Sequence, residues 1–268
     1  MAFASPVKTE FITGGFYDRQ SYYLSPDKLE SDYSPVRFER ELKLFRRFCP
    51  AGRVLDVGCS TGGFLWQLMR RFPSDYQVLG TDVAGKPLDH ARAQGVSILE
   101  GSFLETDERV RKFEAICFWA VLEHLAEPAV FLRKTVALLE PGGFCFALVP
   151  NLHSLAIRLL GPKYRYVMPD HLNYYELGTL RRLFSSVGEL RSVAFGTSHF
   201  NPVVIWNDWR SDSNERVPDS ERGRLLHKTT AMKQSPWLWP LRHVYAGAEK
   251  ALSLAGLADN LWLVARKT

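Results

Sequence analysis

A glycine-rich turn and an acidic residue after the next strand are the residues best suited to bind a ligand. The run from Arg53 to Leu65 reads RVLDVGCSTGGFL, which predicts a buried strand, a turn and the start of a helix. Glycines such as Gly58 and Gly62 allow positive φ angles and let a ligand approach the backbone N–H groups. Asp82 ends the next predicted strand and can accept two hydrogen bonds from a ribose diol. Because ligands of open α/β sheets bind beyond the carboxyl ends of the strands, these groups together predict a nucleotide crevice.

Two histidines are the candidate general bases. His171 stands in a Pro-Asp-His turn, and His124 follows Glu123. Histidine titrates near neutral pH, so either could remove a proton from a hydroxyl acceptor. The structural alternatives are a hydrogen bond made by His171 and a turn capped or oriented by His124. No cluster of His, Cys, Asp and Glu has the spacing of a zinc site, so no metal is predicted.

The sequence of the turn can be compared with known nucleotide-binding motifs. It lacks the G-x-G-x-x-G pattern of dinucleotide sites, and no lysine follows its glycines as in a Walker loop. It does match G-x-S-x-G, the nucleophile elbow of α/β-hydrolases, with Ser60 as the nucleophile. That alternative is disfavoured because it places the elbow after the first sheet strand and leaves Asp82 unexplained.

Short β-branched runs alternate with helical patterns from residue 51, as expected for a doubly wound α/β sheet with crossover helices. The predicted strands of this half are Arg53–Val57, Gln77–Asp82, Val96–Glu100, Ala115–Phe118 and Gly143–Val149. The predicted helices are Phe64–Arg71, Lys86–Gln94 and Pro128–Leu139, with Pro141-Gly142-Gly143 as a helix breaker and turn. Further along, we expect a helix at Glu176–Val187 and strands at Leu190–Phe195 and Leu261–Ala265.

The flanks predict additions to this sheet. Residues 1–50 form a cap or lid, with a helix within Pro35–Phe48 and with Tyr17, Tyr22 and Tyr23 close to the site. Residues 51–268 form the main domain, with an insertion at about 197–258. Within it, apolar residues recur at helical spacing from Trp237 to Ala255. We expect residues 236–256 to pack on the sheet or on a second subunit in a homodimer; contact with a membrane surface is the alternative.

Composition excludes several classes of protein. In 268 residues, 46% are hydrophobic and 24% are charged, unlike a disordered, collagen-like or disulfide-scaffold chain. The net charge of +5 lies in the second half: residues 1–140 hold 18 basic and 19 acidic residues, and residues 141–268 hold 16 and 10. These charges alternate without a basic stripe, which disfavours a nucleic-acid partner. The four cysteines occur singly, and the start of the chain has no secretory signal pattern, so we expect reduced thiols and a cytoplasmic protein.

Several motifs in order resemble one enzyme family. Asp56-Val-Gly58-Cys-Ser60-Thr-Gly62 resembles the first motif of the class I S-adenosylmethionine-dependent methyltransferases, with Ser60 in place of the usual middle glycine. The later segments Phe113–Pro128, Leu138–Phe144, Val149–Asn151 and Pro169–Tyr175 resemble the branch that includes ubiquinone-biosynthesis O-methyltransferases and bacterial sugar and natural-product methyltransferases. The resemblance implies a Rossmann-like, mostly parallel, seven-stranded sheet with helices on both faces.

The resemblance also implies roles for particular residues. Asp56, Gly58, Ser60 and Gly62 would hold the methionine part of S-adenosylmethionine, and Phe118 and Trp119 would approach its methionine end. Asp82 would bind the ribose hydroxyls, with Val83, Ser102 and Phe103 near the adenine. Tyr174 and Tyr175 would lie beside the substrate. Apart from the resemblance, we expect these two residues to close over the site with Tyr17, Tyr22 and Tyr23.

The implied reaction is methyl transfer to a small-molecule acceptor, most simply to a hydroxyl of a sugar, a phenol or a lipid-linked intermediate. The alternatives of the same fold are an N-methyltransferase and an RNA methyltransferase. The sequence alone leaves the acceptor open.

Overall fold

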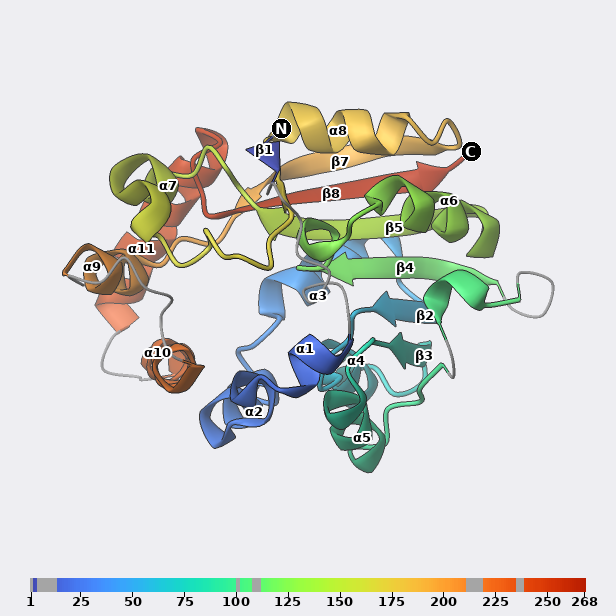
Figure 1. Cartoon of the computed structure of the whole chain (residues 1–268), viewed down its shortest axis with the longest axis horizontal. Helices are drawn as coiled ribbons and strands as arrows, with labels where there is room; N and C mark the ends of the chain where they lie inside the picture. Colours follow the sequence, from blue (N-terminus) through green and yellow to red (C-terminus); the bar gives the residue numbers. More distant parts are fainter. Residues whose placement is uncertain (1, 4–13, 100–101, 108–111, 211–218, 235–238) are drawn as a thin grey trace.

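A mixed six-stranded sheet with strand order β3-β2-β4-β5-β8-β7 forms the centre of the molecule (Figure 1). The computed structural model describes residues 2–3, 14–99, 102–107, 112–210, 219–234 and 239–268. The sheet strands are β2 (Gly52–Val57), β3 (Tyr76–Thr81), β4 (Phe113–Trp119), β5 (Leu139–Pro150), β7 (Leu190–Ser198) and β8 (Asn260–Lys267). β3, β2, β4 and β5 pair in parallel, whereas β8 is antiparallel to both neighbours. The predicted doubly wound, mostly parallel architecture is therefore confirmed.

Helices lie on both faces of this sheet and at one end of it. They are α1 (Gly14–Asp18), α2 (Pro26–Asp32), α3 (Glu39–Phe48), α4 (Gly63–Arg71), α5 (Gly85–Ala93), α6 (Pro128–Leu138), α7 (Leu155–Leu160), α8 (Leu177–Ser185), α9 (Pro202–Arg210), α10 (Asp219–Gln234) and α11 (Trp239–Leu254). Short 3-10 turns are η2 (Ser21–Leu24), η3 (Phe103–Glu105), η4 (Leu122–His124) and η5 (Gly161–Lys163). A small second sheet pairs β1 (Ala2–Phe3) with β6 (Asn173–Tyr174).

Alternation along the strands creates two hydrophobic cores, because successive side chains point to opposite faces of a sheet. Leu55 and Ile116 belong to a core that also holds Leu132 of α6 and Leu180 of α8. Their chain neighbours Val54 and Cys117 belong to the opposite core, which packs against α3, α4 and α5. Both faces of the sheet are thus covered, which leaves its strand ends as the place for a ligand.

Three predicted elements differ from the structure. Residues 96–99 make an isolated bridge between Gly80 and Ile98 instead of a strand, so the described main sheet has six strands where seven were expected. Pro141-Gly142-Gly143 lies inside β5 and does not separate it from α6. The helix expected within Pro35–Phe48 begins only at Glu39, because Phe38 adopts a left-handed conformation with φ of 60°.

The insertion places α9, α10 and α11 at one end of the molecule (Figure 1). α10 packs against α2, and α11 packs beside β7. Two charge contacts tie this region to α3: Arg40 pairs with Glu249 of α11, and Nε2 of His199 lies 2.7 Å from Oε1 of the buried Glu41. Trp237 lies outside the described residues. Among the described helices, none has both the length and the apolar run needed to cross a membrane.

The Glu41–His199 contact predicts acid-sensitive stability. Burial disfavours the Glu41 carboxylate, but the charge and hydrogen bond of His199, with Arg37, lower its pKa from 4.5 to about 2. A depressed carboxyl pKa adds stability that is present above the unfolded value and is lost as pH falls towards 2. Glu41→Gln should remove up to about 3 kcal/mol at neutral pH and flatten the stability curve between those limits. Urea unfolding at several pH values checks this.

Glu39→Gln, at an exposed position on the same helix, is the control. Equal free energies of unfolding for Glu41→Gln and Glu39→Gln at every pH would contradict the assignment.

Candidate active site

The glycine-rich turn between β2 and α4 takes a conformation with three left-handed residues. The φ angles are +73° at Gly58, +50° at Ser60 and +77° at Gly62. Asp82, directly after β3, stabilises this turn: its Oδ2 accepts from the N–H of Ser60 at 2.8 Å and its Oδ1 accepts from that of Ala84 at 3.0 Å. The turn and the acidic residue predicted from the sequence are thus brought together at one edge of the sheet.

The polar groups at this edge are not all satisfied by the protein. Within the described residues, Oδ1 of Asp56 and Oγ of Ser60 have no hydrogen-bond partner. Asp56 is 3% exposed, and burial together with the Asp82 carboxylate raises its pKa well above the ordinary value. Val83, next to Asp82, leaves 65% of its surface exposed. The edge therefore combines carboxylates that would favour a cationic ligand with an open apolar surface.

The N-terminal segment covers the turn from the side of α2. Oγ1 of Thr61 donates to Oδ2 of Asp32 at 3.0 Å, and the hydroxyl of Tyr33 donates to the carbonyl of Thr61. Nε2 of Gln67 donates to the carbonyl of Ser34 at 2.7 Å. These contacts fix residues 32–34 against the turn and against α4, so the segment after α2 is part of the site's frame.

The two candidate bases meet at the end of β4. The rings of His124 and His171 lie edge to face, with centroids 4.7 Å apart. Nδ1 of His124 lies 2.9 Å from the carbonyl oxygen of Asp170, which leaves Nε2 as the basic nitrogen when Nδ1 is protonated. The N–H of Leu172 donates to the carbonyl of Glu123 at 2.7 Å. The chain around residue 171 is thereby fixed to the turn that contains His124.

Glu123 completes a compact polar cluster with the histidines. It is 1% exposed, and burial raises its pKa to about 8. Glu123, His124 and His171 each place one potential ligand atom within 4.8 Å of the others. The absence of a metal site was predicted from spacing along the chain; the structure joins two distant segments into a set able to bind a divalent cation.

Aromatic side chains surround this cluster. The Tyr17 ring lies 5.9 Å from that of His124 and 6.2 Å from that of Tyr23, which in turn lies 5.5 Å from Tyr22. Burial raises the pKa of the Tyr17 phenol, and the charges of Asp170, Asp82 and Glu123 raise it further. Tyr17 therefore stays protonated and lies within electrostatic range of both the Asp82 edge and the histidine cluster.

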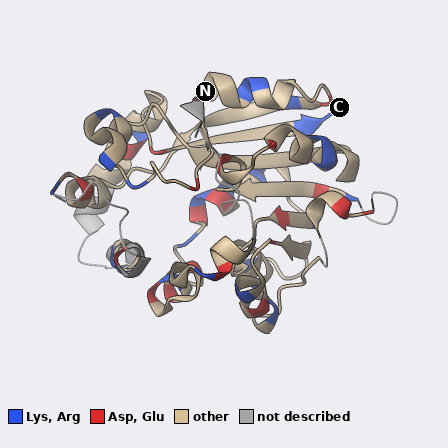
Figure 2. Ribbon diagram, viewed as in Figure 1, with Lys and Arg blue, Asp and Glu red and all other residues tan. Residues whose placement is uncertain are grey.

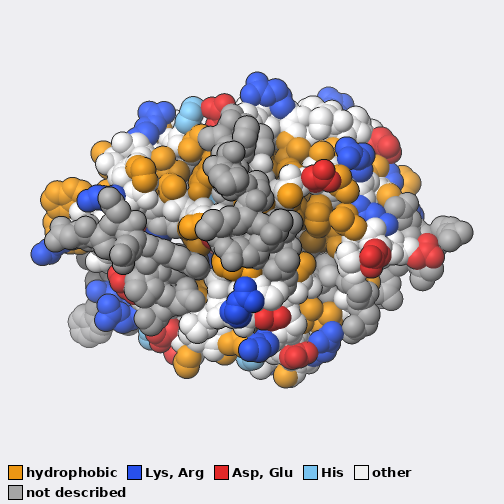
Figure 3. Space-filling model, in the orientation of Figure 1, with side chains coloured by type: hydrophobic (Ala, Val, Ile, Leu, Met, Phe, Trp, Pro, Cys, Tyr) orange, Lys and Arg blue, Asp and Glu red, His pale blue; other side chains and the backbone are white. Residues whose placement is uncertain are grey.

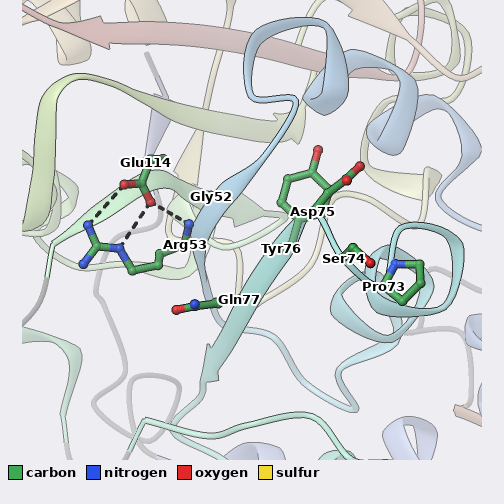
Figure 4. Close-up of a pocket in the computed structure, with 8 residues that line it drawn as sticks. All are labelled: Gly52, Arg53, Pro73, Ser74, Asp75, Tyr76, Gln77 and Glu114. Carbon is green, nitrogen blue, oxygen red and sulfur yellow. Dashed lines mark hydrogen bonds and ion pairs between the residues drawn. The ribbon is translucent and has the colours of Figure 1, made fainter.

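A pocket at the opposite edge of the sheet contains none of these residues (Figure 4). Its lining residues are Gly52, Arg53, Pro73, Ser74, Asp75, Tyr76, Gln77 and Glu114. It lies at the amino ends of β2 and β3, and its arginine is bound to Glu114 at 3.1 Å. Parallel sheets bind ligands at their carboxyl ends, so this pocket is not the candidate site.

Comparison with known proteins identifies the family. Residues 33–188 match the family model described as a methyltransferase domain. The chain belongs to the methyltransferase-domain family. The ubiquinone biosynthesis O-methyltransferase of Chelativorans sp. (strain BNC1) is 34% identical to it over 171 residues. That match covers 58% of this chain and 65% of the relative, so the chain spans a little under two thirds of the curated protein it matches.

Solved structures of the methyltransferase fold agree at low identity. The S-adenosylmethionine-dependent methyltransferase of Archaeoglobus fulgidus superposes with a TM-score of 0.58 at 16% identity, covering 92% of this chain and 100% of that one. The 4+2 cyclase SpnF superposes with a TM-score of 0.62 at 15% identity, covering 98% of both chains. By family the chain therefore carries a methyltransferase domain, and its fold is that of these structures.

The cofactor edge of this methyltransferase fits S-adenosylmethionine chemically. The sulfonium and amino groups are cationic, and their charge would favour the ionised form of Asp56, whose Oδ1 has no partner among the described residues. Both oxygens of Asp82 keep a second lone pair for a ribose diol, because each accepts one backbone N–H. Val83 offers apolar surface to an adenine ring. These assignments remain proposals carried by geometry.

Several predicted site residues of the methyltransferase lie elsewhere. Phe118 and Tyr175 are fully buried core residues, and the hydroxyl of Tyr175 donates to the carbonyl of Leu122 at 3.2 Å. Both side chains therefore support the site from within the core and expose no surface to a ligand. Phe103 is 5% exposed and stacks on Phe131, so little of its ring can reach an adenine.

Three more predicted residues have identified local contacts. Ser102 is exposed and caps the η3 turn by accepting from Leu104 N–H at 3.3 Å. Trp119 packs on Phe64 at 5.2 Å, and its indole N–H has no hydrogen-bond partner among the described residues. Tyr174, 6.1 Å from His171, donates its hydroxyl to the carbonyl of Met168. Of these three, only Tyr174 contacts the histidine cluster.

The serine-hydrolase alternative has no support in this geometry. A catalytic serine needs a base within hydrogen-bond reach. In the described part of the chain, Oγ of Ser60 has no such partner, and both candidate histidines contact each other at the end of β4.

Sequence reasoning missed the roles of Glu123, Asp170 and Asp32. Glu123 and Asp170 each precede a candidate histidine in the chain, and that adjacency was the available signal. The sequence around Asp32 gives no such signal, because its contact with the turn depends on how α2 packs against the turn.

The first of three predictions about the site concerns the shape of the turn. A Cβ atom on Gly58 would lie 2.5 Å from Cγ2 of Val121, whereas one on Gly95, also at positive φ, would meet nothing within 4 Å. Gly95→Ala should cost about 1 kcal/mol for the left-handed conformation alone. Gly58→Ala should cost about 1 to 3 kcal/mol more through overpacking and should weaken cofactor binding. Urea unfolding and titration calorimetry measure both; equal losses would contradict the close packing.

The second prediction concerns the ribose contact. Asp82→Ala removes a carboxylate that we expect to accept hydrogen bonds from the cofactor, and each such charge-assisted bond is worth about 1.5 to 3 kcal/mol. Affinity for S-adenosylhomocysteine should fall about 10- to 100-fold by calorimetry. Asp89→Ala, at an exposed position on α5, is the matched control. Unchanged affinity in the Asp82 variant would refute the assignment.

Proposed function

We propose that the protein methylates a hydroxyl group of a small-molecule acceptor that binds beside the histidine cluster. The observation that carries this proposal is the position of Tyr17, whose ring lies 5.9 Å from that of His124 while Asp82, on the cofactor side, is close enough to raise its pKa. A proton-accepting cluster thus adjoins the edge proposed to hold the methyl donor. The O-methyltransferase activity named for the curated relative supports the same acceptor chemistry.

Methyl transfer requires little covalent chemistry from the protein's own side chains. S-adenosylmethionine supplies a methyl group already activated on a sulfonium. The residues around it must align the acceptor, and alignment can contribute roughly 7 to 11 kcal/mol in favourable cases. Asp56, Asp82 and the backbone of the glycine-rich turn would orient the cofactor, and the tyrosines over the cluster would exclude water.

The histidines would supply the remaining step, which is removal of the acceptor proton. Asp170 holds Nδ1 of His124 through its carbonyl oxygen, and His171 lies against the same ring. A base placed in this way contributes roughly 10²- to 10⁴-fold. We assign proton removal to His171, with His124 beside it in contact with the acceptor.

The alternative acceptors are an amine or an RNA base. An amine would make the histidine cluster unnecessary, because a neutral amine is already a nucleophile. RNA binding calls for a basic stripe, and the acidic residues Glu123 and Asp170 lie at the acceptor side instead. Both observations favour a hydroxyl. Assays against phenols, catechols, sugars, amines and RNA, read as S-adenosylhomocysteine released, would test the assignment.

The third prediction separates the base from the frame. His171→Ala should lower turnover by about 10²-fold or more while S-adenosylhomocysteine binding persists, because the histidine acts on the acceptor proton. His153→Ala, an exposed histidine outside the cluster, is the matched control. Turnover and calorimetry on both variants provide the measurement.

Wild-type turnover in the His171 variant would remove the base assignment. A loss of turnover on dialysis against a chelator, reversed by Mg²⁺ or Zn²⁺, would reassign Glu123, His124 and His171 as metal ligands. In that case a bound cation, and not a histidine, would lower the pKa of the acceptor hydroxyl.

A further inference from the structure

Two short helices at the end of the molecule pack together through a small core of their own. Ala156 and Leu160 of α7 join Val204 of α9 and Tyr164 in a cluster separate from the two main cores. Arg165 binds the buried Asp208 of α9 through its guanidinium and backbone N–H. The relative position of α7 and α9 is therefore fixed, and their outer faces form one surface.

That surface is unusually apolar for an exposed helix pair. Trp206 and Trp209 on α9 are 54% and 61% exposed, and their rings lie 5.2 Å apart. Leu159 on α7 is 64% exposed. In the space-filling view (Figure 3), hydrophobic and basic side chains adjoin at the left end, where Figure 1 places α9. We call Leu159, Trp206 and Trp209, with the basic residues beside them, the tryptophan surface.

The charges of the tryptophan surface have one sign. Its exposed ionisable side chains, Arg158, Lys163 and Arg210, are basic, and the Arg210 guanidinium lies 5.6 Å from the Trp206 ring. Among the described residues of α7, η5 and α9, Asp208 is the single acidic one, and it is buried and bound to Arg165. Figure 2 shows basic residues on both helices.

We propose that the tryptophan surface docks on an anionic lipid bilayer. Tryptophan favours the boundary between headgroups and acyl chains, and basic residues close to an anionic membrane each add to the attraction. A second copy of the chain would place the three basic residues of one surface near those of another, which opposes self-association. The charge of this surface therefore favours the bilayer over a homodimer.

The tryptophan surface lies beside residues 236–256, the segment for which the sequence gave membrane contact as an alternative. Residues 236–256 were the alternative membrane segment; there Val244 and Leu254 of α11 are exposed, but no exposed tryptophan is described. α9 also lies outside residues 33–188, which match the family model. The proposed surface is thus partly a feature of this chain's own insertion. It does not depend on the identity of the methyl acceptor.

The test is co-sedimentation of the full chain with vesicles. We expect binding to vesicles of phosphatidylcholine with an equal amount of phosphatidylglycerol, weaker binding to phosphatidylcholine alone, and release by salt. Trp206→Ala combined with Trp209→Ala should lower the partition coefficient about tenfold or more, and Arg210→Glu should lower it about tenfold. Circular dichroism should show that the variants stay folded, as expected for exposed positions.

Matched controls lie on the outer strand β7. Val193→Ala and Arg191→Glu change exposed apolar and basic residues there and should bind vesicles like the wild type. Failure of the wild type to sediment with anionic vesicles, or wild-type binding by the double tryptophan variant, would overturn the proposal. So would a concentration-dependent dimer that the double variant abolishes without any vesicle binding, because the surface would then belong to a second copy.

Discussion

The close approach of the buried Asp56 carboxyl and the partly buried Asp82 carboxylate, at the ends of neighbouring parallel strands, is the constraint on which the cofactor edge depends. β2 and β3 pair in register, with Asp56 opposite Gly80, so the turn after β2 and Asp82 after β3 must meet. Two acidic groups at close range repel each other when both are ionised. Asp82 offsets part of this repulsion by accepting hydrogen bonds from the backbone N–H groups of Ser60 and Ala84. Asp56 keeps an unsatisfied oxygen, at a cost in stability that a cationic ligand would relieve.

Small residues make this approach feasible. Gly80 has Sγ of Cys59 only 2.6 Å from where a Cβ would stand, and Gly58 faces Val121 in the same way. The turn is therefore packed against β3 on one side and against the loop after β4 on the other. That loop continues into Glu123 and His124, so the packing that shapes the cofactor edge also positions the acceptor side.

The sequence predicted the cofactor edge well because its information is local. A strand, a glycine-rich turn and a terminal Asp82 can be recognised within thirty residues, and each adopts the expected element. The acceptor side is different: Glu123 and His171 come from distant segments, and hydrogen bonds from Leu172, Asn173 and Tyr175 to residues 122–125 hold these segments together. Tyr175, which we expect beside the substrate, is buried in the core and bonds to the carbonyl of Leu122. Residues 96–99 had the composition of a strand, but among the described residues their backbone bonds to a neighbouring strand go to Gly80 alone.

The segment between β7 and β8 is linked to the cofactor edge through α3 even though it lies outside the family match. Arg40 and Glu41 are adjacent on α3, and they bind Glu249 of α11 and His199 before α9. α3 in turn packs its Phe45 into the core shared with the helix after the glycine-rich turn. A displacement of α9 or α11 must therefore strain a buried charge contact next to that core. Separating the partners of such a contact would leave a buried charge without its counterion, which is strongly destabilising. The end of the molecule that bears the tryptophan surface is therefore held in a fixed orientation relative to the cofactor edge.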